Sequence, residues 1–143
     1  ENNIFNYIVV SSTTGYTAFE ALKVLKGFNI EIIVCKQDLN EEFSMCESAV
    51  KNLSEMCRVV EIPRKYLANK IGESGVKIFR CFSQGIKVCI ELLLYLLDMK
   101  IMCKGERVIL IGGTLRGADT AISVEMVSQN NFKVLNIIAF PQR

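Results

Sequence analysis

Short apolar runs alternate with longer amphipathic segments along the first half of the chain. The run Tyr7–Ser11 (YIVVS) is continuous and made of β-formers, which is typical of a strand covered on both faces. Similar runs at Ile30–Cys35 and Arg58–Ile62 predict two more strands. Between them, apolar residues at helical spacing predict helices over Gly15–Leu25 and Glu41–Met56. This β-α-β-α-β alternation predicts an α/β domain with a parallel sheet and right-handed crossovers.

The second half of the chain is predicted to add two helices and further strands. A short helix is expected over Tyr66–Ile71, ended by Gly72 and Gly75, and a long helix over Phe82–Met99. The expected strands, of which the second follows a glycine-rich loop at Gly112–Asp119, are Arg107–Ile111, Thr120–Val124 and Val134–Phe140. No repeat or domain boundary is evident, so residues 1–143 are expected to form a single domain.

Composition and charge narrow the class of protein. The chain has 143 residues, half of them apolar, which suits one compact domain. Its formal charge of +2 comes from scattered basic residues, so we expect no nucleic-acid partner. The most apolar stretch, Ile86–Met102, is interrupted by charged residues and falls short of a membrane span. No signal peptide opens the chain, although its first residue is Glu1 and a preceding segment is compatible with that.

The cysteines indicate a reducing environment rather than a metal site. All six lie in or beside apolar runs, none forms a C-x-x-C pair, and the chain contains no histidine. Zinc and iron–sulfur sites need ligands gathered in short motifs, so we expect no metal. We predict reduced cysteines packed in the core, and hence a cytoplasmic protein. The six are Cys35, Cys46, Cys57, Cys81, Cys89 and Cys103.

The first candidate site follows the first strand and opens the first helix. Unpaired amides and the positive end of the helix dipole favour an anion at that place. Four consecutive hydroxyl residues add donors, and a glycine allows a close backbone approach or a left-handed turn. The alternative is an ordinary helix cap, which needs one or two hydroxyls. The candidate phosphate-binding residues are Ser11, Ser12, Thr13, Thr14, Gly15 and Thr17.

The second candidate is the glycine-rich segment after the fourth strand. It lacks the Lys-Ser/Thr ending of a Walker A loop and feeds a strand rather than a helix. One interpretation is a plain glycine-rich hairpin; the other is a loop that wraps a ligand, with Arg116 offering a bidentate fork to phosphate. If strands one and four are neighbours, both candidate segments open on one edge of the sheet, the usual ligand crevice. Its candidate residues are Gly112, Gly113, Thr114, Arg116, Gly117, Asp119 and Thr120.

A weaker candidate lies at the start of the long helix. Arg80 and Lys87 are either solvated charges or counter-charges for a ligand, and Gln84 beside Gly85 could face a ring system. No catalytic constellation is evident, because the lack of histidine excludes Ser-His and Cys-His pairs. Asp119 is expected to orient the glycine loop through backbone hydrogen bonds.

Three segments carry a family resemblance: IVVSSTTGYTA (Ile8–Ala18), a long block from Phe79 to Ala121, and IIAFPQR (Ile137–Arg143). With them the chain resembles archaeal and bacterial proteins built like a free-standing pyruvate kinase C-terminal domain. The resemblance implies a three-layer α/β/α fold with a mostly parallel sheet of five to six strands, order 3-2-1-4-5, and an antiparallel edge strand.

The resemblance also implies a ligand. In pyruvate kinase, the loop that corresponds to Ser11–Thr17 holds a phosphate of the sugar bisphosphate activator. Members of the free-standing family have been found with flavin mononucleotide (FMN). The chain departs from the family pattern at Cys35–Asn40 and Ile62–Tyr66, where the family tends to carry histidines. The catalytic barrel of pyruvate kinase is absent, so that activity is not implied.

Three hypotheses of function follow. The first is a small-molecule binding domain for a phosphorylated ligand, most favourably FMN. The second is a flavin-dependent oxidoreductase, which would also need an electron donor and an acceptor. The third is a regulatory or assembly module that binds a sugar phosphate. Its assembly, with itself or with another chain, rests on the helix Ile86–Leu97, which is apolar almost all round and therefore either deeply buried or shared with a neighbour, such as a second copy in a homo-oligomer.

Overall fold

The part of the chain that the structure describes folds into a six-stranded sheet and four helices. The structure is a computed structural model and describes residues 4–37, 44–114 and 117–141. Its strands are β1 (Tyr7–Ser11), β2 (Glu31–Gln37), β3 (Arg58–Ile62), β4 (Arg107–Thr114), β5 (Gly117–Ser128) and β6 (Asn131–Ala139). Its helices are α1 (Tyr16–Val24), α2 (Glu47–Met56), α3 (Tyr66–Phe82) and α4 (Gln84–Asp98).

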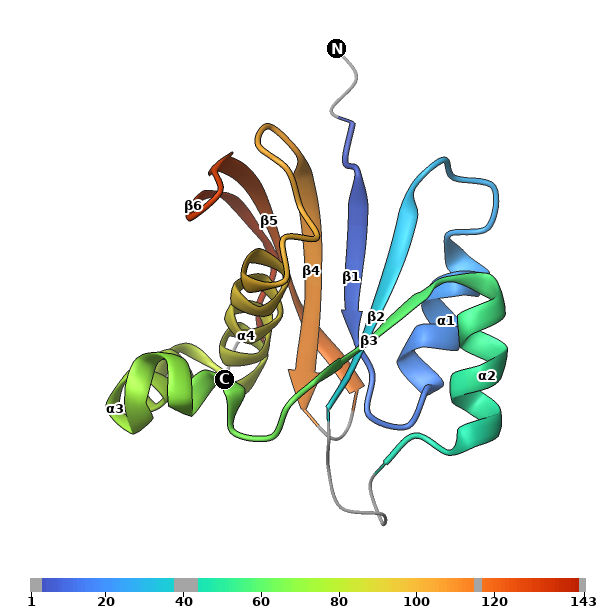
Figure 1. Cartoon of the computed structure of the whole chain (residues 1–143), viewed down its shortest axis with the longest axis horizontal. Helices are drawn as coiled ribbons and strands as arrows, with labels where there is room; N and C mark the ends of the chain where they lie inside the picture. The colour runs from blue at the N-terminus through green and yellow to red at the C-terminus, as the bar shows by residue number, and fades with distance from the viewer. Residues whose placement is uncertain (1–3, 38–43, 115–116, 142–143) are drawn as a thin grey trace.

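The strand order is β3-β2-β1-β4-β5-β6, which confirms the predicted order and extends it by one strand (Figure 1). β1 lies between β2 and β4 and runs parallel to both, with Val9 opposite Ile33 on one side and Leu110 on the other. β5 and β6 add to this parallel part as an antiparallel meander. Because β1 and β4 are parallel neighbours, their carboxyl ends lie at the same edge of the sheet.

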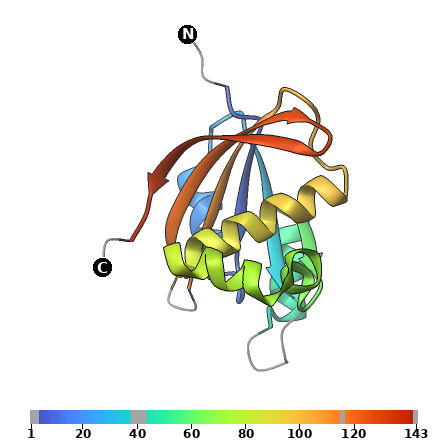
Figure 2. The ribbon, with the colours of Figure 1, turned by 90° about the vertical axis from the view of Figure 1, so that its left-hand side faces the viewer.

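Helices cover both faces of the sheet, so the fold has the predicted three layers. α1 and α2 lie on one face, and α3 and α4 lie on the other (Figures 1 and 2). The strand residues alternate between two hydrophobic cores, as a pleated strand requires. Ile33 packs in the larger core under α3 and α4, whereas its neighbour Val34 packs with Ala18 and Leu53 under α1 and α2. A strand buried on both faces has to be continuously apolar, which explains the run in β1.

The helices whose boundaries differ most from the prediction are α2 and α3. Within the described residues α2 begins at Glu47, because Cys46 has an extended backbone and Met45 is buried in the smaller core; residues 41–43 lie outside the described part. Gly72 interrupts α3 with φ 79°, as the predicted stop suggested, but a second helical part continues to Phe82. The prediction that Gly75 also ends this helix was wrong, since Val76 and Phe79 pack that part against the larger core.

α4 begins at Gln84, two residues after the predicted start at Phe82, and ends at Asp98, one residue before the predicted end. Ser83 is extended, and its hydroxyl accepts a hydrogen bond from the amide of Ile86 at 3.0 Å, which caps the helix. Ten of the fifteen residues of α4 are buried within this one chain, which accounts for its apolar character without a neighbour. Among the described residues, no helix combines the length and the apolar character that crossing a membrane requires.

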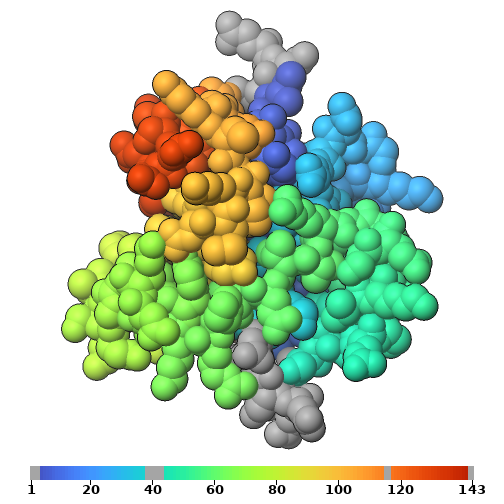
Figure 3. All heavy atoms as spheres, in the orientation of Figure 1, coloured from blue at the N-terminus to red at the C-terminus, as the bar shows by residue number. Residues whose placement is uncertain are grey.

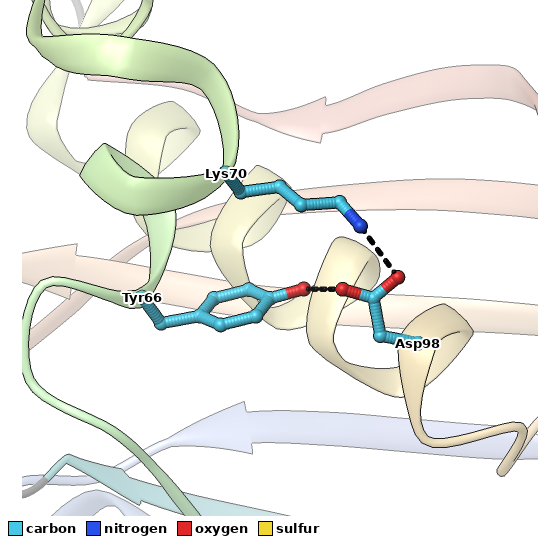
Figure 4. Close-up of polar contacts among 3 residues, drawn as sticks. All are labelled: Tyr66, Lys70 and Asp98. Atoms are coloured by element: carbon cyan, nitrogen blue, oxygen red, sulfur yellow. Dashed lines mark hydrogen bonds and ion pairs between the residues drawn. The ribbon is translucent and has the colours of Figure 1, made fainter.

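Hydrogen bonds at the carboxyl end of α4 connect this helix to α3 (Figure 4). Asp98 accepts hydrogen bonds from the hydroxyl of Tyr66 and from the ammonium of Lys70, the latter at 2.8 Å. The ring of Tyr66 also meets Tyr95 edge-on, with centroids 5.2 Å apart. The hydrogen bond from Lys70, followed by that from Tyr66, lowers the pKa of Asp98. Burial, reinforced by the same bond to Asp98, raises the pKa of Tyr66.

The lowered pKa of Asp98 predicts a pH-dependent contribution to stability. A carboxyl whose pKa is lower in the folded state stabilises above its unfolded pKa and loses that contribution as the pH falls through its folded pKa. We expect Asp98→Asn to lower the free energy of unfolding by roughly 0.5–1 kcal/mol at neutral pH, since the group is partly exposed. The difference from wild type should vanish in acid, as measured by urea unfolding across the acidic range.

The matched control is Glu55→Gln, an exposed change on α2. It should leave the free energy of unfolding within about 0.5 kcal/mol of wild type at every pH. A difference between Asp98→Asn and wild type that stays constant from neutral to acidic pH would contradict the assignment.

Candidate functional site

The β1–α1 turn has the backbone conformation that an anion site at a helix start needs. Gly15 adopts φ 100°, a left-handed conformation that other residues rarely adopt, and α1 begins at the next residue. Among the described residues, the amides of Tyr16 and Thr17 make no hydrogen bond to the protein. The turn therefore presents two donors at the positive end of the helix dipole.

The hydroxyl side chains of this turn differ in burial and in their hydrogen bonds. Ser12 is buried: its Oγ accepts from the amide of Ala18 at 3.3 Å, and its own amide donates to the carbonyl of Cys35. Ser12 thus serves as the ordinary helix cap that the sequence left as an alternative. Thr14 is exposed, and Thr13 and Thr17 are half-buried. Ser11, at the end of β1, is also half-buried; beyond it, the hydroxyls that remain accessible to a ligand are those of the three threonines.

The glycine-rich segment is a β-hairpin, so the expectation of an open loop from Gly112 to Asp119 was wrong. Its first arm belongs to β4 and its second to β5, with Gly112 paired to Thr120 and Thr114 paired to Gly117. Leu115 and Arg116 lie outside the described residues. The predicted bidentate contact of Arg116 with phosphate therefore falls outside the part of the chain that the structure describes. The hairpin interpretation, which the sequence kept open, is the one that the structure supports.

Two of the glycines are required by close packing. A Cβ on Gly113 would lie 2.0 Å from the carbonyl oxygen of Gly117 across the hairpin. A Cβ on Gly112 would lie 2.7 Å from the carbonyl oxygen of Gly85 in α4. The backbones of β4 and α4 therefore approach each other with no side chain between them. Close packing therefore requires glycine at both positions, independently of any ligand.

The hydrogen bond that Asp119 makes differs from the backbone hydrogen bonds that the sequence predicted for it. Its Oδ1 accepts a hydrogen bond of 2.7 Å from the hydroxyl of Thr120, the next residue along β5. Thr120 is buried against Gly85, whose Cβ position would lie only 2.0 Å from the threonine hydroxyl. The carboxylate thus orients a buried threonine side chain rather than the backbone of a glycine loop.

A cleft of about 690 Å³ brings four of the predicted site residues together. Arg80 and Gln84 come from the junction of α3 and α4, while Thr114 and Asp119 come from the hairpin. Residues 140 and 141, a phenylalanine and a proline, supply apolar lining beside Phe82. The cleft combines a cation, an amide, a hydroxyl and a carboxylate with aromatic walls, a set that suits a polar ring-bearing ligand.

The β1–α1 turn does not line this cleft. The turn leads into the layer of α1, whereas the cleft lies against the layer of α3 and α4. Both adjoin the carboxyl edge of the sheet, where β1 and β4 are neighbours. The two predicted halves of the site therefore flank one edge from opposite faces.

Lys87 is a buried charge and not the solvated one that the commoner interpretation described. Its ammonium lies 2.8 Å from Oε2 of Glu91, one turn along α4. The same carboxylate oxygen accepts from the amide nitrogen of Gln37, at the end of β2, at 2.9 Å. Gln37 and Glu91 were not among the predicted site residues, although the four-residue spacing of Lys87 and Glu91 is a recognised signal for a helical ion pair.

This ion pair lines a second cavity, of about 200 Å³. The cavity lies between α3, α4 and the segment after β3, and Arg80 adjoins it as well as the larger cleft. Of the predicted site residues, Arg80 and Lys87 meet here.

All six cysteines are free, but the prediction that all are packed in the core was wrong. Cys46, Cys81 and Cys103 are exposed, because the apolar runs around them are only partly buried. Burial raises the pKa of Cys35, and burial together with the charge of Asp119 raises that of Cys89 to about 12. Within the described ranges, no three acidic or cysteine side chains gather as a metal site would require.

No protein-family model matches this chain. The resemblance to the pyruvate kinase C-terminal domain therefore rests on the three sequence segments that carry it.

The contact between Gly85 and Thr120 predicts the effect of adding one methyl group. Alanine is a better helix former than glycine by about 1 kcal/mol, which favours Gly85→Ala. Its Cβ would lie 2.6 Å from the Cβ of Thr120, however, and relieving such a clash costs about 1–3 kcal/mol. We expect a net loss in the free energy of unfolding, measured by chemical denaturation.

The control is Gln84→Ala, an exposed change at the preceding residue. It should change the free energy of unfolding by less than about 0.5 kcal/mol. A Gly85→Ala variant more stable than wild type would show that α4 and β5 are not in this close contact.

Proposed function

We propose that this domain binds a phosphorylated small molecule, with FMN as the favoured ligand. The phosphate lies on the β1–α1 turn, where the amides of Tyr16 and Thr17 and the hydroxyls of the three threonines donate to it. The organic part extends over the carboxyl ends of β1 and β4 towards the cleft that contains Gln84 and Asp119.

One observation carries the proposal: the start of α1 presents unpaired amides beside the end of β4. The parallel pairing of β1 with β4 supports it, because the order of the sheet changes direction at this pair. Ligands of open α/β sheets bind in the crevice at such a point. Phosphate is a favourable occupant, since the helix dipole and the free amides both act on an anion.

The larger cleft supports a ligand with an organic ring system. Its walls include Phe82 and Phe140, whose rings can pack against a flat aromatic group, and the amide of Gln84 can bond a heteroatom. The choice of FMN among phosphorylated ring compounds rests on the family resemblance alone.

A comparison of FMN with riboflavin tests the role of the phosphate. We expect FMN to bind at least about ten-fold more tightly than riboflavin, a difference of about 1.4 kcal/mol, because riboflavin lacks the phosphate. The double variant Thr14→Val/Thr17→Val should weaken FMN binding and leave riboflavin binding unchanged. Quenching of flavin fluorescence on titration measures both affinities.

Ser128→Ala is the matched control, because Ser128 lies at the end of β5, which runs opposite to β4. It should bind both flavins as wild type does. Equal affinity for FMN and riboflavin, or no binding of either, would contradict the proposed phosphate site.

A specific observation also favours self-assembly, the third hypothesis. β6 forms one edge of the sheet and lies at the molecular surface (Figure 3). Val134 and Ile138 are 44% and 53% exposed, and Ile137 is 54% exposed, so apolar side chains of the strand remain in solvent. Edge strands usually carry charges that prevent pairing, yet no charged residue occurs between Val134 and Ala139. We propose that two copies pair antiparallel through β6.

The mass in solution tests this assembly. Wild type should have twice the mass of one 16.1 kDa chain, and Ile138→Lys should shift it towards the single-chain mass by placing like charges at the pairing edge. Val24→Lys, an exposed change on α1, should leave the mass unchanged. Light scattering after size-exclusion chromatography gives the mass, and a wild type that is monomeric at all concentrations would contradict pairing through β6.

A further inference from the structure

The cavity around Lys87 and Glu91 has a buried polar interior and a charged mouth. Lys87 is 9% exposed and Glu91 3% exposed, so this ion pair lies in the protein interior. Leu67 and Val76 of α3, both buried, form apolar walls beside it. The exposed residues of the lining are at the mouth; they include Arg64, Lys65, Glu73 and Arg80.

The position of this ion pair is not explained by stability. Taking two charges out of water is costly, and a buried ion pair is commonly no more stabilising than apolar side chains of the same size. Here the pair is also anchored from another element, because Gln37 of β2 donates to the oxygen of Glu91 that Lys87 contacts. Such anchoring holds the ammonium of Lys87 in one place at the wall of a cavity.

The ammonium retains donors that the protein does not use. Lysine has three N–H donors, and among the described residues Lys87 forms one hydrogen bond, the one to Glu91. The described part of the chain contains no fully enclosed side-chain polar atom that lacks a partner. Lys87 lines the cavity and its side chain is 11% exposed, which leaves its remaining donors facing that space.

The charge of the cavity favours an anion. Among the described residues of the lining, Lys87 and Glu91 neutralise each other, whereas Lys65 and Arg80 against Glu73 leave a formal excess of one positive charge at the mouth. The apolar walls strengthen the attraction, because charges interact more strongly where water is excluded. The volume, about 200 Å³, corresponds to about seven water molecules at ~30 Å³ each.

We infer that this cavity is a binding site for a compact anion, such as a small dicarboxylate or inorganic phosphate. The cations at the mouth neutralise its charge, and the ammonium of Lys87 donates to its inner end. The site is separate from the phosphate site on the β1–α1 turn, since no residue of that turn lines it. It goes beyond the proposed function and does not depend on it.

The test uses malonate and inorganic phosphate as probes, at a pH where both are dianions, with malonamide as the neutral counterpart of malonate. Amide chemical shifts of ¹⁵N-labelled protein locate the binding. We expect malonate and phosphate to shift the amides of Leu67, Val76 and Lys87, and malonamide to leave them unshifted. Added sodium chloride should weaken the binding, because it screens the charges at the mouth.

The double variant Lys87→Met/Glu91→Leu tests whether the buried ion pair takes part in binding. A single change at Lys87 would leave the carboxylate of Glu91 buried without its cation, whereas the double change replaces the pair by apolar side chains of similar size and preserves folding. The variant should bind malonate at least about ten-fold more weakly than wild type. Thr14→Val/Thr17→Val should bind malonate as wild type does.

The outcomes separate this inference from the proposed function. Absent shifts, shifts confined to the amides of residues 13–17, equal shifts with malonamide, or undiminished binding by Lys87→Met/Glu91→Leu would each overturn the inference. None of them bears on the preference for FMN over riboflavin. Loss of that preference, in turn, would leave the malonate result unchanged.

Discussion

The direct contact of the α4 backbone with β4 and β5 is the constraint on which the rest of the structure depends. Gly85 and Gly112 meet without side chains between them, and Thr120 occupies the space that a Cβ on Gly85 would take. Interiors are close-packed, so an approach this tight allows one placement of α4 over the sheet. That placement also fixes the junction of α3 and α4, because Ser83, which caps α4, directly follows α3.

Both cavities follow from this placement of α4. The larger cleft forms because the α3–α4 junction lies opposite the hairpin of β4 and β5, which brings Arg80 and Gln84 near Asp119. The smaller cavity forms because α4 directs Lys87 and Glu91 towards the end of β2, and α3 covers them from outside. The contacts of Asp98 with Tyr66 and Lys70 hold α3 in that covering position. Packing and polar contacts thus act together to form the sites.

The turn after β1 shows how one short segment serves structure and function at once. Ser12 completes the hydrogen bonds of the fold, while the left-handed Gly15 leaves the next two amides of α1 open. The four consecutive hydroxyl residues 11–14 look equivalent in the sequence, but Ser12 is buried and the other three are not. The sequence predicted the location of this turn correctly because it depends only on a strand followed by a helix. The division of roles among its hydroxyls depends on which of them faces Ala18 and the neighbouring strand.

The sequence by itself determined the α/β class, the parallel strands and most helix positions, because apolar periodicity reflects burial on one face or on two. It also marked Gly112, Gly113 and Gly85 as unusual. Only the tertiary structure decided what those glycines do, since Gly85 and Gly112 let two distant backbones touch, and Gly113 lets the two arms of the hairpin approach each other. The same holds for Gln37, Lys87 and Glu91: the spacing in α4 is local, but their burial and their shared contact depend on the end of β2 reaching that helix. Residues far apart in the chain acquire a joint role only when the fold brings them together.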